Sequence, residues 1–224
     1  MALTPPQLRI NGDGYRLTII GDTGSGKTVA ALYHLSRQDF SIPWVVYDWK
    51  LDGSLNEIAR AKHVDTEFTP AKRDRGIFIV HPRRRDFSAV EQQLDRLYER
   101  EDVGIYFDEG RMTEDSELTE DLITQGRSKG IPMIVLSQRP VDLTRYLWGN
   151  SEYVQYFPFG DDRDMDTAAK FMSGLKDKPA LLPRFWSYYY DKFSRALHTL
   201  KPVPEAKESL ERIDSKLRRR KILL

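Results

Sequence analysis

Hydrophobic residues along this chain gather in short continuous runs that alternate with segments of helical periodicity. Runs of β-forming residues lie at 15–20, 44–47, 77–80, 103–107 and 133–136, with a further candidate at 153–157. Strands that are hydrophobic throughout, and that alternate with helices, are typical of parallel sheets covered on both faces. The pattern predicts an α/β fold with a mainly parallel sheet flanked by helices.

The predicted helices come from apolar positions spaced three and four residues apart. Phe87, Val90, Leu94 and Leu97 share one helical face after the third strand. Further helices are expected at 29–35, 120–127 and 164–172, the second of them stopped by Gly130 and Pro132.

The last two predicted strands are joined by a shorter link than the strands before them. The segments 186–190 and 193–197 are separated only by Asp191 and Lys192, a link too short for a crossover between parallel strands. The sequence therefore predicts a terminal antiparallel hairpin.

Pro202 and Pro204 mark the end of the α/β region, which we expect to be one domain over residues 1–200. Residues 201–224 predict a basic amphipathic helix and tail, with eight Lys or Arg against four Asp or Glu. Leu210, Ile213 and Leu217 form an apolar stripe on this helix. The stripe favours packing against the parent domain, with a contact to another subunit or to nucleic acid as the alternatives.

Composition narrows the class of protein. The 224 residues are 40% hydrophobic, enough for a full core, and they contain no cysteine, which excludes disulfides and thiolate metal sites. The four histidines show no ligand spacing. The chain shows no apolar run long enough to span a bilayer and no signal-peptide pattern at its start, so we expect a soluble, intracellular protein.

One sequence motif indicates that the protein binds a nucleoside triphosphate. Residues 21–28 fit the phosphate-binding loop G-x-x-x-x-G-K-[ST], placed between a predicted strand and a predicted helix. Gly21, Gly24 and Gly26 are expected to take positive φ and to turn backbone N–H groups toward the phosphates of ATP. Lys27 would reach the β- and γ-phosphates, and Thr28 would ligate Mg²⁺. The predicted nucleotide-binding residues are Gly21, Asp22, Thr23, Gly24, Ser25, Gly26, Lys27 and Thr28.

Two later strands end in residues that suit ATP hydrolysis. Asp108 and Glu109 follow the run 103–107, as in the second nucleotide motif of such ATPases. Asp108 would hold Mg²⁺, directly or through water, and Glu109 would act as the general base for the attacking water. Gln138 ends the next strand, where its amide would bind the γ-phosphate or the water, because ligands lie outside the carboxyl ends of parallel strands.

The segment 126–140, which ends in Gln138-Arg139-Pro140, resembles the sensor strand of the FtsK/HerA superfamily of DNA-pumping ATPases. Asp48-Trp49-Lys50 is similar to the Asp-Pro-Lys after the second strand of that family, with Trp in place of Pro. The strand candidate 153–157 and the polar turn 161–164 are similar to the family's segment after the sensor. The resemblance covers roughly residues 15–172.

Membership of this superfamily implies a homo-oligomeric ring, in which an arginine finger reaches the ATP of a neighbouring subunit. Arg127 is the first candidate for the finger, because it lies just before the sensor strand in the matching segment. Its rivals are Arg83, Arg84, Arg85 and Arg163.

Size selects among the members of the superfamily. Larger translocases carry membrane segments or additional domains, whereas the compact form is similar to the genome-packaging ATPases of membrane-containing icosahedral viruses. This resemblance implies a motor that pumps double-stranded DNA, irrespective of sequence, into a preformed capsid at a vertex or portal component. It would act in the host cytoplasm and at the packaging vertex of the virion.

Two alternatives remain open at this stage. One is an assembly ATPase of filamentous phage, of the zonula-occludens-toxin type, and the other is a small P-loop kinase.

In a DNA-pumping motor, DNA would be held through its phosphates by two basic clusters. The candidate contacts are Arg83, Arg84 and Arg85, and in the tail Arg218, Arg219, Arg220 and Lys221.

Overall fold

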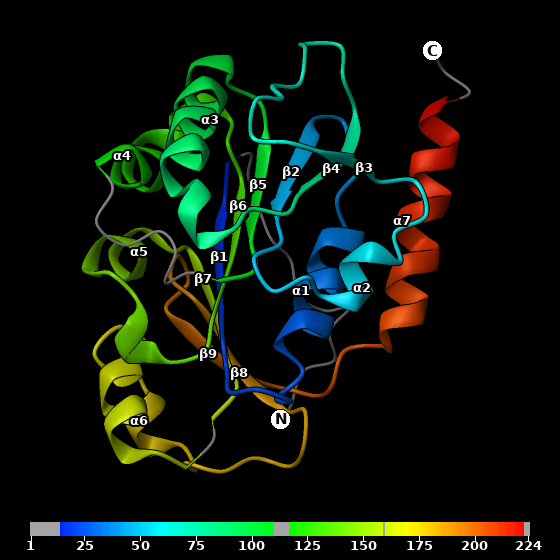
Figure 1. Ribbon diagram of the computed structural model, residues 1–224. Helices are drawn as coiled ribbons and strands as arrows, with labels where there is room; N and C mark the ends of the chain where they lie inside the picture. The colour runs from blue at the N-terminus through cyan, green and yellow to red at the C-terminus, as the bar shows by residue number, and fades with distance from the viewer. Residues whose placement is uncertain (1–13, 110–116, 159, 222–224) are drawn as a thin grey trace.

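The computed structural model describes residues 14–109, 117–158 and 160–221. These residues form one nine-stranded sheet in the order β3-β4-β2-β5-β6-β1-β7-β8-β9 (Figure 1). The first seven strands in this order are parallel, and β8 and β9 are antiparallel additions at one edge. The strands are β1 (Arg16–Ile20), β2 (Pro43–Tyr47), β3 (Lys62–Val64), β4 (Gly76–Val80), β5 (Gly104–Phe107), β6 (Met133–Ser137), β7 (Tyr153–Tyr156), β8 (Ser187–Asp191) and β9 (Ala196–Leu200).

Helices cover both faces of the sheet (Figure 1). One face carries α1 (Lys27–Ser36), α2 (Gly53–Asn56) and α7 (Ala206–Lys221). The other carries α3 (Phe87–Arg100), α4 (Glu117–Gln125), α5 (Arg145–Asn150) and α6 (Asp162–Ala169). Short 3-10 turns complete the connections: η2 (Arg84–Asp86), η4 (Gly126–Lys129), η5 (Pro140–Asp142) and η6 (Leu175–Asp177).

The central strands are hydrophobic throughout because both of their faces are buried. In β6, Met133 and Val135 enter the core beneath α3 to α6, whereas Ile134 and Leu136 enter the core beneath α1 and α7. All four side chains are at most 1% exposed. Side chains alternate across a strand, so a continuous apolar run supplies both cores at once. The predicted fold class is confirmed.

The parallel register fixes where the loops meet. In the sheet, β6 lies between β1 and β5, and β2 lies between β5 and β4. The carboxyl ends of these five strands therefore line one edge of the sheet, which is the usual position of ligands in such folds.

The terminal hairpin is confirmed, but the predicted two-residue link was wrong. Strand β9 begins at Ala196, so the turn holds Lys192 to Arg195. The carboxylate of Asp191 accepts hydrogen bonds from the backbone N–H groups of Phe193 and Ser194, at 2.9 and 3.4 Å, and Arg195 takes a positive φ of 53°. The carboxylate thereby stabilises a longer turn than the pattern indicated.

Strand β3 was not predicted from the sequence. It has only three residues, Lys62, His63 and Val64, none of them buried, and it pairs with β4 at the edge of the sheet. A short polar edge strand lacks the apolar run by which the other strands were recognised.

The apolar stripe of the C-terminal helix packs on the domain, as predicted. Leu210, Ile213 and Leu217 are at most 7% exposed and join the core beneath α1. The ammonium of Lys216 donates hydrogen bonds of 2.7 Å to the carbonyl oxygens of Ser36 and Gln38 at the end of α1. The boundary between residues 1–200 and 201–224 stays a prediction. Within the described residues, no helix has the length and apolar character needed to cross a bilayer.

Candidate nucleotide-hydrolysis site

The loop between β1 and α1 has the backbone of an anion cradle. Gly24 and Gly26 take positive φ values of 80° and 97°, which favour glycine. Helix α1 starts at Lys27 with no side chain capping its first N–H groups and no acidic residue in its first turn. Unpaired N–H groups at a helix start attract anions, so this loop is suited to phosphate.

Gly21 has a different role from the one predicted. Its φ is not positive, and the expectation of a left-handed conformation there was wrong. A Cβ at this position would lie 2.5 Å from the Oγ of Ser25 and 2.8 Å from the Cβ of Phe157. The N–H of Gly21 donates to the carbonyl oxygen of Ser137 on β6 at 3.1 Å. Glycine is needed because the loop packs closely, and not because of its backbone angle.

Lys27 places a buried cation in the loop. Its side chain is almost completely buried, and its ammonium donates to the carbonyl oxygen of Asp22 at 3.3 Å. Burial, and next the positive charge of Lys50, lower the pKa of Lys27, whereas Asp108 and Glu109 act in the opposite direction. These electrostatic interactions show that the loop faces the end of β5. An anion bound in the loop would offset the desolvation of the ammonium.

Asp108 is buried at the end of β5 and has a free carboxylate oxygen. The N–H of Asp108 donates to the carbonyl oxygen of Tyr47 at 3.1 Å, which fixes the backbone. The side chain is 1% exposed, and its Oδ2 accepts no hydrogen bond. Burial raises the pKa of Asp108 to about 7. A buried carboxylate oxygen without a donor is suited to a divalent cation.

The donor set fits Mg²⁺ in particular. Among the described residues, no group of three or more His, Asp or Glu side chains is placed to enclose a metal ion. Mg²⁺ does not need such a cage, because it keeps several waters and binds through one or two protein oxygens and the phosphates of its substrate. Thr28 at the start of α1 and Asp108 at the end of β5 would supply those protein oxygens.

Glu109 and Gln138 come together as predicted. Gln138 Nε2 lies 3.5 Å from Glu109 Oε2, and both residues line a cavity of about 500 Å³ at the carboxyl edge of the sheet. Glu109 is 16% exposed, so it reaches the cavity and remains accessible to water. A carboxylate and an amide that line the same cavity are able to orient a nucleophilic water.

Lys50 belongs to this site, although it was not assigned a role from the sequence. Its ammonium lies 3.0 Å from Glu109 Oε2, 4.0 Å from Asp108 Oδ2 and 3.2 Å from the Asp108 carbonyl oxygen. Its ammonium thus faces both members of the carboxylate pair. Lys50 lies three residues beyond the end of β2, which is next to β5. This position was the available signal, but it could be used only once the strand order was known.

A chain of polar groups begins at His81, which lines the same cavity as Lys50 and Glu109. The buried Asp48 faces His81, with 3.3 Å between Asp48 Oδ2 and His81 Nδ1, and His81 Nε2 lies 2.9 Å from His63 Nδ1. The two imidazole rings stack at 5.1 Å. The histidines are far apart in sequence but are brought together by the pairing of β3 with β4, which the sequence did not predict.

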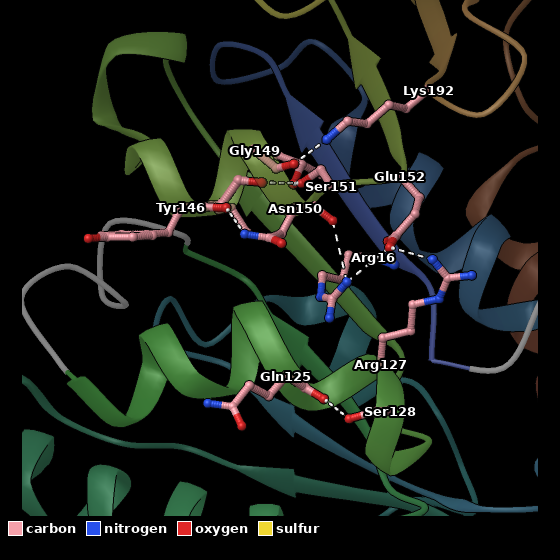
Figure 2. Close-up of polar contacts among 12 residues, drawn as sticks. Arg16, Gln125, Arg127, Ser128, Tyr146, Gly149, Asn150, Ser151, Glu152 and Lys192 are labelled. Atoms are coloured by element: carbon pink, nitrogen blue, oxygen red, sulfur yellow. Dashed lines mark hydrogen bonds and ion pairs between the residues drawn. The ribbon is translucent and has the colours of Figure 1, made fainter.

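Arg127 does not join the other candidate catalytic residues within one subunit. It lies in η4, before β6, and therefore at the amino edge of the sheet. Figure 2 shows it beside Arg16, with both arginines pointing toward Glu152. Its Nη1 lies 3.7 Å from Glu152 Oε1, its guanidinium stacks on Phe193 at 5.2 Å, and its side chain is 54% exposed.

The rival arginines lie elsewhere. Arg83 lines the 500 Å³ cavity, and Arg85 is 74% exposed and 3.7 Å from Asp86. Arg163 is exposed in the first turn of α6. Arg139, the arginine of the Gln-Arg-Pro segment, is held by Asp164 and Asp161 at 2.8 and 2.9 Å, so it braces α6. Arg84 lies in η2.

The two predicted basic clusters lie at opposite edges of the sheet. Arg83 to Arg85 follow the carboxyl end of β4, beside the cavity that Glu109 lines. Arg218 to Lys221 form the end of α7, where Leu217 helps to line a second cleft of about 460 Å³ at the amino ends of β3 and β4. Four cationic residues line that cleft: Arg60, Lys62, Arg73 and Arg75.

The raised pKa of Asp108 predicts a pH-dependent stability. The folded-state pKa is above the ordinary value of 3.8, so the proton is bound more tightly in the native state. The resulting stabilisation is present below pH 3.8 and is lost as pH rises toward about 7. In metal-free buffer, we expect Asp108→Asn to gain stability relative to the wild type over this range, by on the order of 4 kcal/mol. Urea unfolding at several pH values measures this difference, and a constant difference would contradict the assignment.

Comparison with known proteins identifies the family and agrees with the fold. No protein-family model matches the chain. DNA packaging ATPase P9 of Enterobacteria phage PRD1 is 39% identical over 227 residues, which cover 96% of this chain and 99% of that protein.

Solved structures show the same fold at lower identity. The genome packaging NTPase B204 of Sulfolobus turreted icosahedral virus 2, solved with ATP-gammaS, superposes with a TM-score of 0.68 at 15% identity, over 85% of this chain and 98% of that one. The pCW3 conjugation coupling protein TcpA gives 0.63 at 13% identity, over 93% of this chain and 65% of TcpA. On the strength of the 39% identity across nearly the whole chain, this protein belongs to the family of DNA-packaging ATPases that includes P9 of phage PRD1.

Proposed function

We propose that this protein couples hydrolysis of ATP, with Mg²⁺, to the movement of double-stranded DNA into a preformed capsid. The observation that carries the proposal is the meeting of four groups at one edge of the sheet. They are the phosphate loop after β1, Asp108 and Glu109 after β5, and Gln138 after β6. We place the protein in the host cytoplasm and at the packaging vertex, where a capsid vertex or portal component would be its partner.

In the proposed mechanism each residue acts through the geometry described above. The loop N–H groups and Lys27 bind the phosphates. Thr28 and Asp108 would hold Mg²⁺, which would supply positive charge to neutralise the charge that develops on the γ-phosphate. Glu109 takes a proton from the attacking water, and Gln138 orients that water. Lys50, at 3.0 Å, pairs with the Glu109 carboxylate and holds it in position at the cavity.

We further propose that the subunits form a homo-oligomeric ring and that Arg127 acts on the ATP of a neighbour. Arg127 lies at the edge of the sheet opposite its own phosphate loop, so it is unable to serve that loop. It is half exposed, and Glu152 and Phe193 hold its guanidinium in place. An ordered, exposed cation of this kind is suited to stabilise a transition state across a subunit interface.

We propose that DNA is held through its phosphates, without readout of bases. Arg83 to Arg85 would place DNA next to the hydrolysis site, whereas Arg218 to Lys221 would place it at the opposite edge of the sheet. The tail has nearby basic support from Arg73 and Arg75, which line the adjoining cleft. A packaging motor must process every sequence of a genome, so backbone contacts are the appropriate kind.

Substitutions in the hydrolysis site should give two different phenotypes. Lys27→Ala should weaken ATP binding and abolish hydrolysis, because the charge on the phosphates is lost. Glu109→Gln should keep ATP binding and reduce turnover about 10²-fold or more, because only the base is lost. Hydrolysis is measured with and without linear duplex DNA. Stimulation of the wild type by duplex supports the motor, and its absence together with phosphorylation of a small acceptor would favour a kinase.

Arg127→Ala should leave the ATP affinity of a subunit unchanged and reduce turnover of the assembled ring, by about 10³-fold as for other arginine fingers. Mixing provides the specific test. Arg127→Ala subunits have an intact loop and Lys27→Ala subunits have an intact finger, so mixed rings should recover activity at some interfaces. Assembly is checked by sedimentation, and mixed rings that stay inactive would count against a role in trans.

DNA affinity should fall steeply with salt and vary little between unrelated duplexes. Removing one phosphate contact should reduce the slope of log affinity against log salt by about 0.9. Triple Arg→Ala variants at 83–85 and Ala variants at 218–221 test the two clusters separately. Lys178→Ala and Lys207→Ala remove exposed cations outside both clusters and should leave the slope unchanged. If neither cluster changes the slope, the DNA path lies elsewhere.

A further inference from the structure

A buried ion pair at the amino edge of the sheet takes no part in the proposed hydrolysis mechanism. Arg16, the first residue of β1, donates from Nη1 to Glu152 Oε1 at 2.9 Å, and its backbone N–H donates to Glu152 Oε2 at 2.7 Å. The two side chains are only 3% and 9% exposed. Arg16 thus fixes both carboxylate oxygens of Glu152, which lies just before β7.

The stability of the fold does not explain why an arginine occupies this position. Desolvation opposes the attraction between two buried charges, so apolar residues often replace such a pair without loss of stability. Burial lowers the pKa of Arg16, Glu152 opposes this effect, and the positive charge of Arg127 adds to it. Among the described residues, Arg16 Nε and Nη2 find no hydrogen-bond acceptor. Only Nη1 is used, toward Glu152 and toward the carbonyl oxygen of Asn150 at 3.5 Å.

Arg127 is the third charged residue of this cluster, as Figure 2 shows. Its Nη1 lies 3.7 Å from Glu152 Oε1, the oxygen that also accepts from Arg16. Two guanidinium groups therefore share one carboxylate, and one positive charge is left uncompensated. Because Arg16 is buried and Arg127 is 54% exposed, Arg127 presents that charge to the exterior.

We propose that Arg16 is a positioning residue for the arginine finger, because it holds Glu152 in place and balances its charge. The inference deepens the proposed function and rests on Arg127 acting as that finger. A carboxylate that faced Arg127 alone would orient the finger but would also neutralise it. With Arg16 as the counter-charge, Glu152 orients Arg127 and leaves its positive charge available to the γ-phosphate of a neighbouring subunit.

Two further contacts restrict Arg127 from other directions. Its guanidinium lies 5.2 Å from the ring centroid of Phe193, whose N–H donates to Asp191 at 2.9 Å in the turn of the hairpin. A Cβ on Gly14 would lie 2.7 Å from the carbonyl oxygen of Arg127, so the segment that enters β1 packs against the backbone of the finger. A finger that is ordered before the neighbour binds loses less side-chain entropy on contact.

The test compares two substitutions of Arg16 in ATP hydrolysis by the assembled protein with linear duplex DNA. Arg16→Lys keeps the counter-charge, and one ammonium is enough because only Nη1 is used, so kcat should stay near that of the wild type. Arg16→Met removes the counter-charge, so Glu152 captures Arg127 and kcat should fall by up to about 10²-fold. The KM for ATP should stay unchanged in both variants, because the phosphate loop is untouched.

Further variants separate this effect from a general loss of folding. In an Arg127→Ala background, Arg16→Met should have no further effect, because no finger is left to capture. Adding Glu152→Met to Arg16→Met removes the uncompensated carboxylate and should restore part of the lost turnover. Thermal unfolding reports the stability of every variant. Glu101→Gln is the matched control, since it removes the 3.2 Å ion pair with Lys129, in the same 3-10 turn as Arg127, and should leave turnover unchanged.

The proposal is overturned if Arg16→Met lowers turnover equally in the wild-type and Arg127→Ala backgrounds, or if the folded Arg16→Met protein keeps the wild-type kcat. If Arg16→Met does not fold, the variant with Met at both Arg16 and Glu152 carries the test, because it buries no unpaired charge. Wild-type turnover in that variant would also overturn the proposal.

Mixed rings distinguish this inference from the proposed function. If Arg127→Ala subunits recover no activity with Lys27→Ala subunits while Arg16→Met and Arg127→Ala remain non-additive, the proposed role in trans is wrong and the positioning by Arg16 stands. If Arg127→Ala subunits recover activity and Arg16→Met acts independently of them, the finger stands and the positioning by Arg16 is wrong.

Discussion

The parallel pairing of β1, β6 and β5 is the constraint on which the site depends. Because β6 pairs in parallel with both β1 and β5, the phosphate loop, Gln138 and Asp108 lie side by side along the carboxyl edge of the sheet. The backbone itself continues this arrangement beyond the strands. Gly21 N–H bonds the carbonyl oxygen of Ser137, and Asp108 N–H bonds that of Tyr47, so the first residue of each loop is fixed to the neighbouring strand. A one-residue slip would turn every functional side chain to the other face.

The same edge concentrates charges that are expensive to bury. Lys27 and Asp108 are both nearly inaccessible to water, and burial shifts the pKa of each toward its neutral form. Lys50 offsets part of the cost for Asp108 by facing both carboxylates of the Asp108-Glu109 pair, but its positive charge adds to the cost of burying Lys27. A ligand with complementary charges would offset the cost of burying these groups. In a magnesium-bound triphosphate, the phosphates would pair with Lys27 and the metal ion with Asp108.

The sequence was sufficient for the features that depend on local pattern. Buried parallel strands are apolar throughout, and the phosphate loop has a fixed spacing, so the fold class and the loop with its flanking elements could be predicted. Contacts that depend on the lateral order of strands could not. The roles of Lys50 and of the His63–His81 pair follow from placing β2 beside β5 and β3 beside β4, and β3 has no sequence signal of its own.

The positions of the two basic clusters and of the linker before α7 relative to the sheet could not be predicted from the sequence either. Arg73 and Arg83 are close in sequence, but β4 runs between them and separates them to opposite edges of the sheet. Helix α7 runs from the carboxyl edge of the sheet to its amino edge, opposite to the direction of β4. Its 16 residues extend about 24 Å. It begins at Ala206, which lines a cavity beside the phosphate loop, and reaches the second cleft through Leu217. A single helix, fixed to α1 by Lys216 and by its apolar stripe, therefore joins the phosphate-loop edge of the sheet to the cleft that Arg60, Lys62, Arg73 and Arg75 line at the opposite edge.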